Sequence, residues 1–201
     1  EGVLIPRPET ETLVQRVLEL CRSEGLSAPD IADLCSGSGA IAITLKKQLP
    51  AARVKAVELS EAAAVYLKEN IRLNAADIGE ADLIIGDAAE PAIAQQLSGL
   101  DIVVSNPPYL TAKEMSQLQR EVRSEPEMAL YGGSDGLNFY RTLTRIWKDS
   151  IRPGGWLCYE VGDCQAESVR DILAMNGFEN IELTCGFERI ARVVSGQKTG
   201  G

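Results

Sequence analysis

Short apolar runs alternate with longer amphipathic segments along most of the chain. Five runs have the length and apolar character of buried strands: residues 30–34, 53–59, 81–86, 101–105 and 156–161. Five segments place apolar residues at helical spacing: about residues 8–25, 40–49, 61–74, 137–151 and 164–176. Strands that alternate with helices in this way are typical of a parallel α/β sheet.

Two further apolar runs, near 179–184 and 190–195, close the pattern. The connection between them is too short for a helical crossover, so these two strands must be antiparallel. The sequence therefore predicts a seven-stranded α/β sheet that is mostly parallel and ends in an antiparallel hairpin. We expect residues 1–29 to form an entry segment and helix packed on a domain of residues 30–195, and the tail from 196 to 201 to fray.

Composition places the chain in the ordinary globular class. Its 201 residues are 45% hydrophobic and 24% charged, which suits one domain with a sizeable core. No uncharged stretch approaches the ~18–20 residues that a membrane span needs. The chain begins with Glu1 rather than Met, which indicates a fragment or a trimmed start.

Net charge and cysteine usage narrow the possible partners and compartments. A net charge of −9 is unfavourable for holding a long nucleic acid, since affinity there comes mainly from Lys and Arg on phosphates. Five cysteines without C-x-x-C spacing indicate a reducing compartment and argue against disulfides and a zinc site. The absence of His excludes Ser-His and Cys-His nucleophilic sites and any His-bound metal. An enzyme of this composition must work by positioning, by carboxylates or through a cofactor.

The first candidate site is the loop of small residues between the strand at 30–34 and the helix at 40–49. It reads Cys35-Ser36-Gly37-Ser38-Gly39. Glycines allow close backbone approach, and the following helix offers free N–H groups at its start. The strand, loop and helix therefore predict a unit that cradles a ligand.

Carboxylates follow the next two strands. Glu58 lies 19 residues after Gly39, where α/β nucleotide-binding units place the acid that accepts both ribose hydroxyls. These features predict an adenosine-containing ligand; the alternative is a helix-capping loop with a surface glutamate. Asp87, followed by Ala88, either accepts from an adenine amino group or caps the next helix, and both interpretations stay open.

The second candidate site is Asn106-Pro107-Pro108-Tyr109, directly after the strand at 101–105. Two prolines stiffen the backbone and leave the Pro107 carbonyl without a ladder partner. Together with the Asn106 side-chain oxygen, this carbonyl can hold both hydrogens of a planar –NH2 group, with the Tyr109 ring beside it. The motif predicts a grip on a carboxamide or on the exocyclic amine of a base. The alternative is a proline-rich turn with Tyr109 as partial core.

The region after this motif holds a short predicted helix at about 113–121 and a Gly-rich loop at 132–136, which either covers the site or connects two elements. Six basic and six acidic residues balance between positions 113 and 149, so this expected substrate wall is not a basic stripe. They are Lys113, Arg120, Arg123, Arg141, Arg145 and Lys148 against Glu114, Glu121, Glu125, Glu127, Asp135 and Asp149.

The order of elements resembles the Rossmann-like fold of S-adenosylmethionine-dependent methyltransferases, and the tetrapeptide resembles the (Asn/Asp)-Pro-Pro-(Tyr/Phe) signature of those that act on amino groups. Nearly the whole chain, about residues 3 to 195, resembles the HemK-like (PrmC-type) N5-glutamine methyltransferases of peptide-chain release factors. The residues that carry this resemblance are Pro6-Arg7-Pro8-Glu9-Thr10-Glu11, Glu125-Pro126, Ala129-Leu130, Gly132-Gly133, Asp135-Gly136-Leu137, Glu160-Val161-Gly162 and Gln165.

Three departures from the family pattern concern the cofactor loop, the last hairpin and the N-terminal region. Cys35 stands where the family usually has Gly. Gly186 and Arg189 stand where it usually has Asp and Gly, although Arg192 matches. The small N-terminal helical domain of the family is absent from this sequence.

The resemblance implies methyl transfer from S-adenosylmethionine to a glutamine side-chain nitrogen of a release factor. It implies cofactor contacts from residues 35–39, Glu58, Asp87, Ala88 and Asn106. It also implies substrate contacts from Arg7, Glu9 and the tetrapeptide, with Asn106, Pro107, Pro108 and Tyr109 as the catalytic set and no metal. We expect a cytoplasmic monomer without stable nucleic-acid or membrane binding.

Three other functions compete with this interpretation. An N6-adenine methyltransferase acting on DNA or RNA presents the same –NH2 group on an sp² carbon. A nicotinamide-dependent dehydrogenase shares the cradle loop but does not need the tetrapeptide. A non-catalytic binding module keeps the cofactor fold, although the intact motif at Asn106 argues against it.

Overall fold

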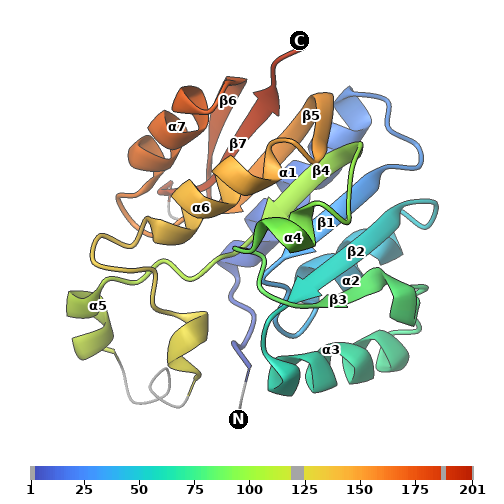
Figure 1. The fold of residues 1–201 in the computed structure, drawn as a ribbon, viewed down its shortest axis with the longest axis horizontal. Helices are drawn as coiled ribbons and strands as arrows, with labels where there is room; N and C mark the ends of the chain where they lie inside the picture. The colour runs from blue at the N-terminus through green and yellow to red at the C-terminus, as the bar shows by residue number, and fades with distance from the viewer. Residues whose placement is uncertain (1–2, 119–124, 187–188, 201) are drawn as a thin grey trace.

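The computed structural model describes residues 3–118, 125–186 and 189–200, in which seven strands form one sheet (Figure 1). The sheet order is β3-β2-β1-β4-β5-β7-β6. In chain order the strands are β1 (Asp30–Leu34), β2 (Arg53–Glu58), β3 (Leu83–Ile85), β4 (Leu100–Ser105), β5 (Ile151–Glu160), β6 (Phe178–Cys185) and β7 (Ala191–Lys198). Only β7 runs in the direction opposite to the other six strands, and it pairs with both β5 and β6. The predicted fold class is confirmed.

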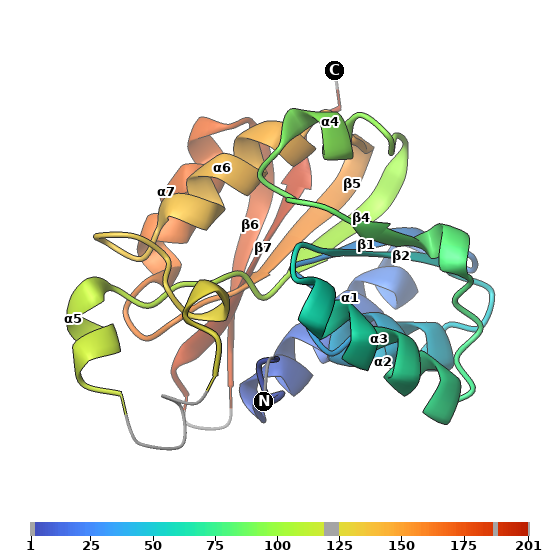
Figure 2. The same ribbon diagram turned by 60° about the horizontal axis from the view of Figure 1, so that its bottom comes forward.

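Helices cover both faces of the sheet (Figure 2). One face carries α1 (Glu9–Ser23), α2 (Ala40–Gln48) and α3 (Glu61–Leu73), whose apolar side chains form one core cluster with the sheet. The other carries α4 (Pro91–Ala94), α6 (Asn138–Trp147) and α7 (Ala166–Met175). Two short elements, α5 (Ala112–Ser116) and the 3-10 turn η3 (Glu127–Ala129), lie apart from both layers (Figure 1). A second 3-10 turn, η1 (Glu80–Asp82), precedes β3.

The parallel register brings the predicted site residues to one edge of the sheet. β1 pairs with both β2 and β4, with Leu34 opposite Val57 on one side and Ser105 on the other. The carboxyl ends of these strands therefore meet, and each ends in a segment with candidate chemistry. This central position is the usual place for a ligand in an open α/β sheet.

The fifth strand is longer than the sequence pattern predicts, and the helix before it is shorter. β5 begins at Ile151 rather than Trp156, and α6 ends at Trp147 rather than Ile151. Ile151 pairs with Leu100, and the ladder resumes at Trp156 opposite Ile102. The predicted Pro-Gly-Gly turn is therefore a bulge within the strand, and Gly154 reaches a φ of 75° there. Because this pairing partner lies 51 residues away, local pattern alone does not reveal it.

The predicted frayed tail is also corrected. β7 continues to Lys198, and the Lys198 ammonium donates to the carbonyls of Lys148 at 2.6 Å and Ile151 at 2.7 Å. In the middle of the chain, β3 (Leu83–Ile85) is shorter than the strand predicted at 81–86, because residues 80–82 form η1. The predicted helix at 113–121 corresponds to α5 up to Ser116, and its last residues lie outside the described ranges.

Candidate active site

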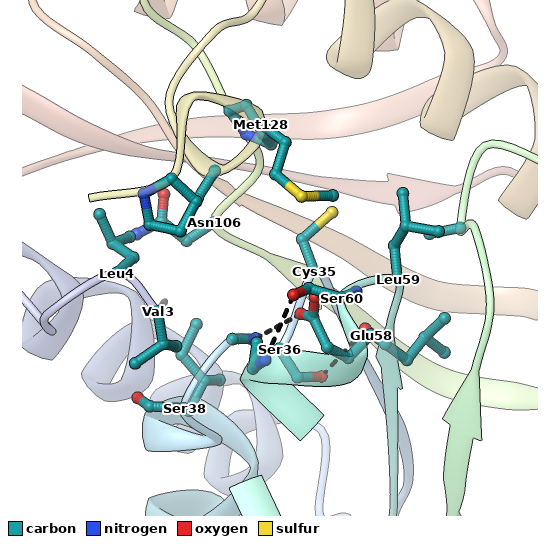
Figure 3. A pocket seen from close by; sticks show the side chains of 18 of the residues that line it. Val3, Leu4, Cys35, Ser36, Ser38, Glu58, Leu59, Ser60, Asn106 and Met128 are labelled. Atoms are coloured by element: carbon teal, nitrogen blue, oxygen red, sulfur yellow. Dashed lines mark hydrogen bonds between the residues drawn. The ribbon is translucent and has the colours of Figure 1, made fainter. Parts of the chain in front are cut away.

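A single cleft gathers most of the predicted site residues at the carboxyl edge of the sheet (Figure 3). It encloses about 930 Å³, the open solvent at its mouth included. Side chains from the N-terminal segment, the ends of β1, β2, β3 and β4, and the η3 region line it. They include Val3, Leu4, Pro6, Thr10, Cys35, Ser36, Gly37, Ser38, Glu58, Leu59, Ser60, Asp87, Ala88, Asn106, Pro108, Met128 and Phe139.

The loop after β1 is fixed by its own hydrogen bonds. The Ser36 hydroxyl donates to the Asp33 carbonyl at 2.7 Å, and the Ser36 N–H donates to the Val57 carbonyl at 3.0 Å. Cys35 and Gly37 have φ values of 58° and 54°, in the left-handed region. The chain thus turns sharply here and presents Cys35 to the cleft, where its sulfur and that of Met128 point toward one another (Figure 3). Burial raises the pKa of the Cys35 thiol to about 12, so it stays uncharged at neutral pH.

Gly39 serves the packing of this loop rather than the cleft wall. It precedes α2 with a φ of 82°, and a Cβ at this position would lie 2.3 Å from Leu67 Cδ1 on α3. The glycine therefore lets α2 begin directly against α3. Of the predicted loop residues, Cys35, Ser36, Gly37 and Ser38 line the cleft and Gly39 does not.

Glu58 ends β2 as a nearly buried carboxylate that faces the cleft. Its Oε2 accepts from the Gly37 N–H and its Oε1 from the Ser60 N–H, each at 2.7 Å. A carboxylate oxygen has two lone-pair sites, so both oxygens retain capacity for a further donor. Glu58 therefore both ties the loop after β1 to β2 and offers a paired acceptor for a diol.

Asp87 takes the capping role that its sequence allowed, and it also lines the cleft. Its Oδ1 accepts from the Ala89 N–H at 2.8 Å, which caps the turn after β3, and the residue also lines the cleft. Ala88 lies beside it with its carbonyl accepting from the Trp147 indole at 2.8 Å. This hydrogen bond holds the turn after β3 against α6, and it thereby fixes the position of the cleft wall at Asp87 and Ala88.

Asn106 and Pro108 reach the cleft from the end of β4. The Asn106 Nδ2 donates to Thr10 Oγ1 at 3.5 Å, so the side-chain oxygen is the end directed away from Thr10. Among the described residues, no donor bonds the Pro107 carbonyl, as the stiff Pro-Pro backbone predicts. Two acceptors thus stand free beside one another in sequence, as a grip on an –NH2 group requires.

Tyr109 does not line the cleft; glycines enclose it instead. A Cβ on Gly162 would lie 2.9 Å from the Tyr109 ring, one on Gly136 would lie 2.3 Å from the Tyr109 carbonyl, and one on Gly132 would lie 2.6 Å from its Cα. The Gln165 amide donates to the Tyr109 carbonyl at 2.9 Å and accepts from the Gly162 N–H at 3.0 Å. The Gly-rich loop at 132–136 is therefore a packing partner of the tetrapeptide.

Arg7 and Glu9 also lie outside the cleft lining. The Arg7 guanidinium bonds the Glu125 carboxylate at 2.7 Å, and this ion pair joins the N-terminal segment to the segment that leads into η3. Both segments contribute to the cleft wall, through Leu4 and Met128 among others (Figure 3). Arg7 therefore shapes the cleft from behind, while Glu9 occupies the first residue of α1.

Two buried polar residues near Asn106, Thr10 and Glu160, were not identified as site residues from the sequence. Both fall in segments that carried the family resemblance, which was the signal that could have found them. The Thr10 hydroxyl donates to Glu160 Oε2 at 2.7 Å, across 150 residues of sequence. Burial raises the pKa of Glu160 to about 7, and the bond from Thr10 lowers it in part.

The comparisons with known proteins agree with this geometry. Residues 10–132 match the family model of the methyltransferase small domain. A release factor glutamine methyltransferase from Thermodesulfovibrio yellowstonii is 39% identical over 199 residues, which cover 98% of this chain and 70% of the relative. A 4-amino-L-phenylalanine/4-methylamino-L-phenylalanine methyltransferase from Streptomyces pristinaespiralis is 35% identical over 179 residues. This match covers 88% of this chain and 59% of that relative.

The solved structures include a release factor-specific protein-(glutamine-N5) methyltransferase from Alicyclobacillus acidocaldarius. It is 25% identical, with a TM-score of 0.59, and the match covers 98% of this chain and 95% of that one. The fold and the cleft thus define a methyltransferase of the Rossmann-like class. Within that class, the chain belongs to the release factor glutamine methyltransferase family.

In the described part of the chain, none of the helices has the length and apolar character needed to cross a bilayer. All five cysteines are free thiols.

Proposed function

We propose that this chain transfers a methyl group from S-adenosylmethionine to the side-chain amide nitrogen of a glutamine in a peptide-chain release factor. The observation that carries the proposal is the pair of free acceptors, Asn106 Oδ1 and the Pro107 carbonyl, at the end of β4 beside a cleft with a buried carboxylate. The family membership supports the same reaction and the same cofactor.

The residues of the cleft fit the cofactor. Glu58 keeps lone pairs for the two ribose hydroxyls, and Asp87 keeps Oδ2 for an adenine amino group. Apolar side chains such as Leu59 and Phe139 suit the adenine ring and the apolar part of the ligand. When bound, S-adenosylmethionine supplies an electrophilic methyl group on a sulfonium. We propose that residues 35–38, Glu58, Asp87 and Ala88 hold it.

The protein's task is to prepare a poor nucleophile. The lone pair of an amide nitrogen is delocalised into its carbonyl, as in the peptide bond. Hydrogen bonds from the –NH2 group to Asn106 Oδ1 and to the Pro107 carbonyl would hold the nitrogen in place and favour a tetrahedral geometry. Positioning of this kind can lower a barrier by roughly 7–11 kcal/mol. The two carbonyl dipoles also stabilise the positive charge that develops on nitrogen.

The test offers labelled S-adenosylmethionine to a release factor, to unmethylated DNA and RNA, and to 4-aminophenylalanine in parallel. We expect label only on a release-factor glutamine. The Asn106→Ala variant should lose at least about a hundredfold in kcat, as removal of one oxyanion-hole donor does elsewhere, with the cofactor Kd nearly unchanged. The Asn176→Ala variant is the matched control, because Asn176 caps α7 far along the chain.

The alternatives are outcomes of the same assay. Label confined to nucleic acid would replace the protein substrate with an adenine, and label on 4-aminophenylalanine alone would indicate a small aromatic amine. Full turnover by Asn106→Ala would contradict the proposed mechanism whichever substrate is labelled. We further propose that the protein acts as a monomer and that it acts in the cytoplasm, the latter supported by its free thiols and its translation-related family.

A further inference from the structure

Behind the substrate face of Asn106 lies a buried chain of polar groups that the methyl transfer itself does not use. Thr10 on α1 and Glu160 at the end of β5 are 8% and 2% exposed. They contact each other through the 2.7 Å bond from Thr10 Oγ1 to Glu160 Oε2. Asn106 joins them through Thr10, because its Nδ2 lies 3.5 Å from Thr10 Oγ1, and the Asn106 amide also lowers the pKa of Glu160.

The direction of these bonds decides which end of the Asn106 amide faces the substrate. A threonine hydroxyl has one hydrogen, and this one is committed to the Glu160 carboxylate. Thr10 Oγ1 can therefore only accept from Asn106, and the Glu160 carboxylate can also only accept. The acceptor at Thr10 therefore requires the –NH2 end of Asn106, and the Asn106 oxygen is left for the substrate.

We propose that Thr10 and Glu160 are positioning residues that hold the Asn106 amide in the one orientation able to accept a hydrogen bond from the substrate nitrogen. The inference rests on the proposed function, since it concerns the same grip. Without this pair, a 180° turn of the amide would present –NH2 to the substrate –NH2, and the grip would lose one of its two acceptors.

Protonation of Glu160 reverses the direction of these hydrogen bonds. A protonated carboxyl can donate to Thr10 Oγ1, which frees the Thr10 hydrogen to donate to Asn106 Oδ1. Both orientations of the Asn106 amide then make a hydrogen bond to Thr10. In the turned orientation, Asn106 Oδ1 no longer faces the substrate and cannot accept from its –NH2 group. Since the pKa of Glu160 is raised to about 7 by burial, this reversal falls in the neutral range. Charged and titratable groups face Glu160 from each element packed on it: Glu9, Arg192, Tyr109 and Tyr140, with Asp163 paired to Arg192.

The first test measures kcat on the release factor and the cofactor Kd in four variants. Thr10→Val and Glu160→Gln should lower kcat by about tenfold or more, the scale of a lost charge-assisted hydrogen bond, with the cofactor Kd within about twofold. Thr10→Ser keeps the hydroxyl and should restore most of the rate. Thr144→Val is the control, because Thr144 is also a buried threonine that loses one hydrogen bond, to Tyr159 at 3.2 Å.

The pH profile separates positioning from a merely structural role. Wild-type kcat should fall on the acid side with a midpoint near the Glu160 pKa of about 7, and Glu160→Gln should lack that limb. Wild-type kcat in Thr10→Val, or an unchanged acid limb in Glu160→Gln, would overturn the proposal.

A second measurement needs no substrate, so it keeps the two proposals distinguishable. The side-chain ¹⁵N–¹H₂ resonances of Asn106, assigned by their loss in Asn106→Ala, are followed from pH 5 to 9. We expect them to titrate with Glu160 in the wild type and to broaden or shift in Thr10→Val. Asn106 resonances that respond neither to pH nor to Thr10→Val would refute the positioning role. Absence of label on the release factor, with this titration present, would refute the proposed substrate alone.

Discussion

The side-chain amide of Gln165 holds the backbone of Tyr109 through a 2.9 Å hydrogen bond to the Tyr109 carbonyl. The same amide accepts from the Gly162 N–H at 3.0 Å. One side chain thus fixes the segment after the acceptor pair to the end of β5. Rigid support of this sort is what keeps a reacting group within the small tolerance that catalysis requires.

Gly162 should therefore tolerate no side chain. In Gly162→Ala the new Cβ would meet both the Tyr109 ring and Gln165 Oε1 at 2.9 Å, so the tetrapeptide must shift. We expect a loss of at least about tenfold in kcat, in keeping with the sensitivity of positioned groups to small displacements. Gly79→Ala is the control, since its Cβ would make only an ordinary 3.5 Å contact with Asp82. Equal activity in the two variants would contradict the role of the packed Tyr109.

Glu58→Ala should weaken cofactor binding and also loosen the loop after β1. The variant removes the proposed ribose acceptor and leaves the Gly37 and Ser60 N–H groups without their partner. We expect the cofactor Kd to rise by about 10- to 100-fold, the scale of one or two hydrogen bonds to a charged group. Calorimetric titration measures this, with Glu61→Ala, at an exposed residue of α3, as the matched control. An unchanged Kd would remove the ribose assignment.

Cys35 should accept Gly far better than a β-branched residue. Its φ of 58° lies in the left-handed region, which costs a non-glycine residue on the order of 1–2 kcal/mol. Cys35→Gly should change the free energy of unfolding by less than about 1 kcal/mol, because relief of strain offsets a more flexible unfolded chain. Cys35→Val should destabilise by more than that. Thermal melts compare the pair, with the same two changes at exposed Cys164, whose φ is 63°, as reference.

Asp33 gives the stability of the protein a pH dependence of known sign. Burial raises the pKa of this carboxyl from 3.8 to about 8, and its Oδ1 has no hydrogen-bond partner among the described residues. The folded state therefore holds a proton that the unfolded state releases between these values, so stability falls as pH rises from about 4 to 8. Burial of Glu160 acts in the same direction up to about pH 7.

Replacement by Asn should reduce this dependence. Asp33→Asn retains an oxygen for the Ala42 N–H, which now bonds Asp33 Oδ2 at 3.1 Å, and carries no charge. At pH 8 we expect the variant to be more stable than the wild type by on the order of 1 kcal/mol, and at pH 5 to be equal or less stable. Urea unfolding of both proteins at pH 5 and pH 8 measures whether their order of stability reverses between the two pH values. A variant that runs parallel to the wild type would contradict the buried, protonated carboxyl.

The sequence predicted what is decided locally, and the rest depends on distant contacts. Glycine, proline and polar residues mark the ends of β1, β2 and β4 in the sequence, and of the residues predicted there Cys35–Ser38, Glu58 and Asn106 line the cleft. The start of β5 depends on its pairing with Leu100, and Thr10 meets Glu160 across 150 residues. No periodicity encodes such contacts. The Gly-rich loop at 132–136 was left open between cover and connector, and only the packing of Tyr109 against Gly132 and Gly136 gives it a physical reason.

The Arg7–Glu125 ion pair bears on how long a bound molecule remains in the cleft. The Glu125 side chain is 5% exposed and the Arg7 side chain 36%, so water and salt reach the pair from the arginine side. The two segments that it joins both line the cleft, so a molecule bound between them would leave more easily if they separated. Added salt weakens such an accessible pair. Ionic strength should therefore shorten the residence time of a molecule bound in the cleft, because the wall around it would open more readily at high salt.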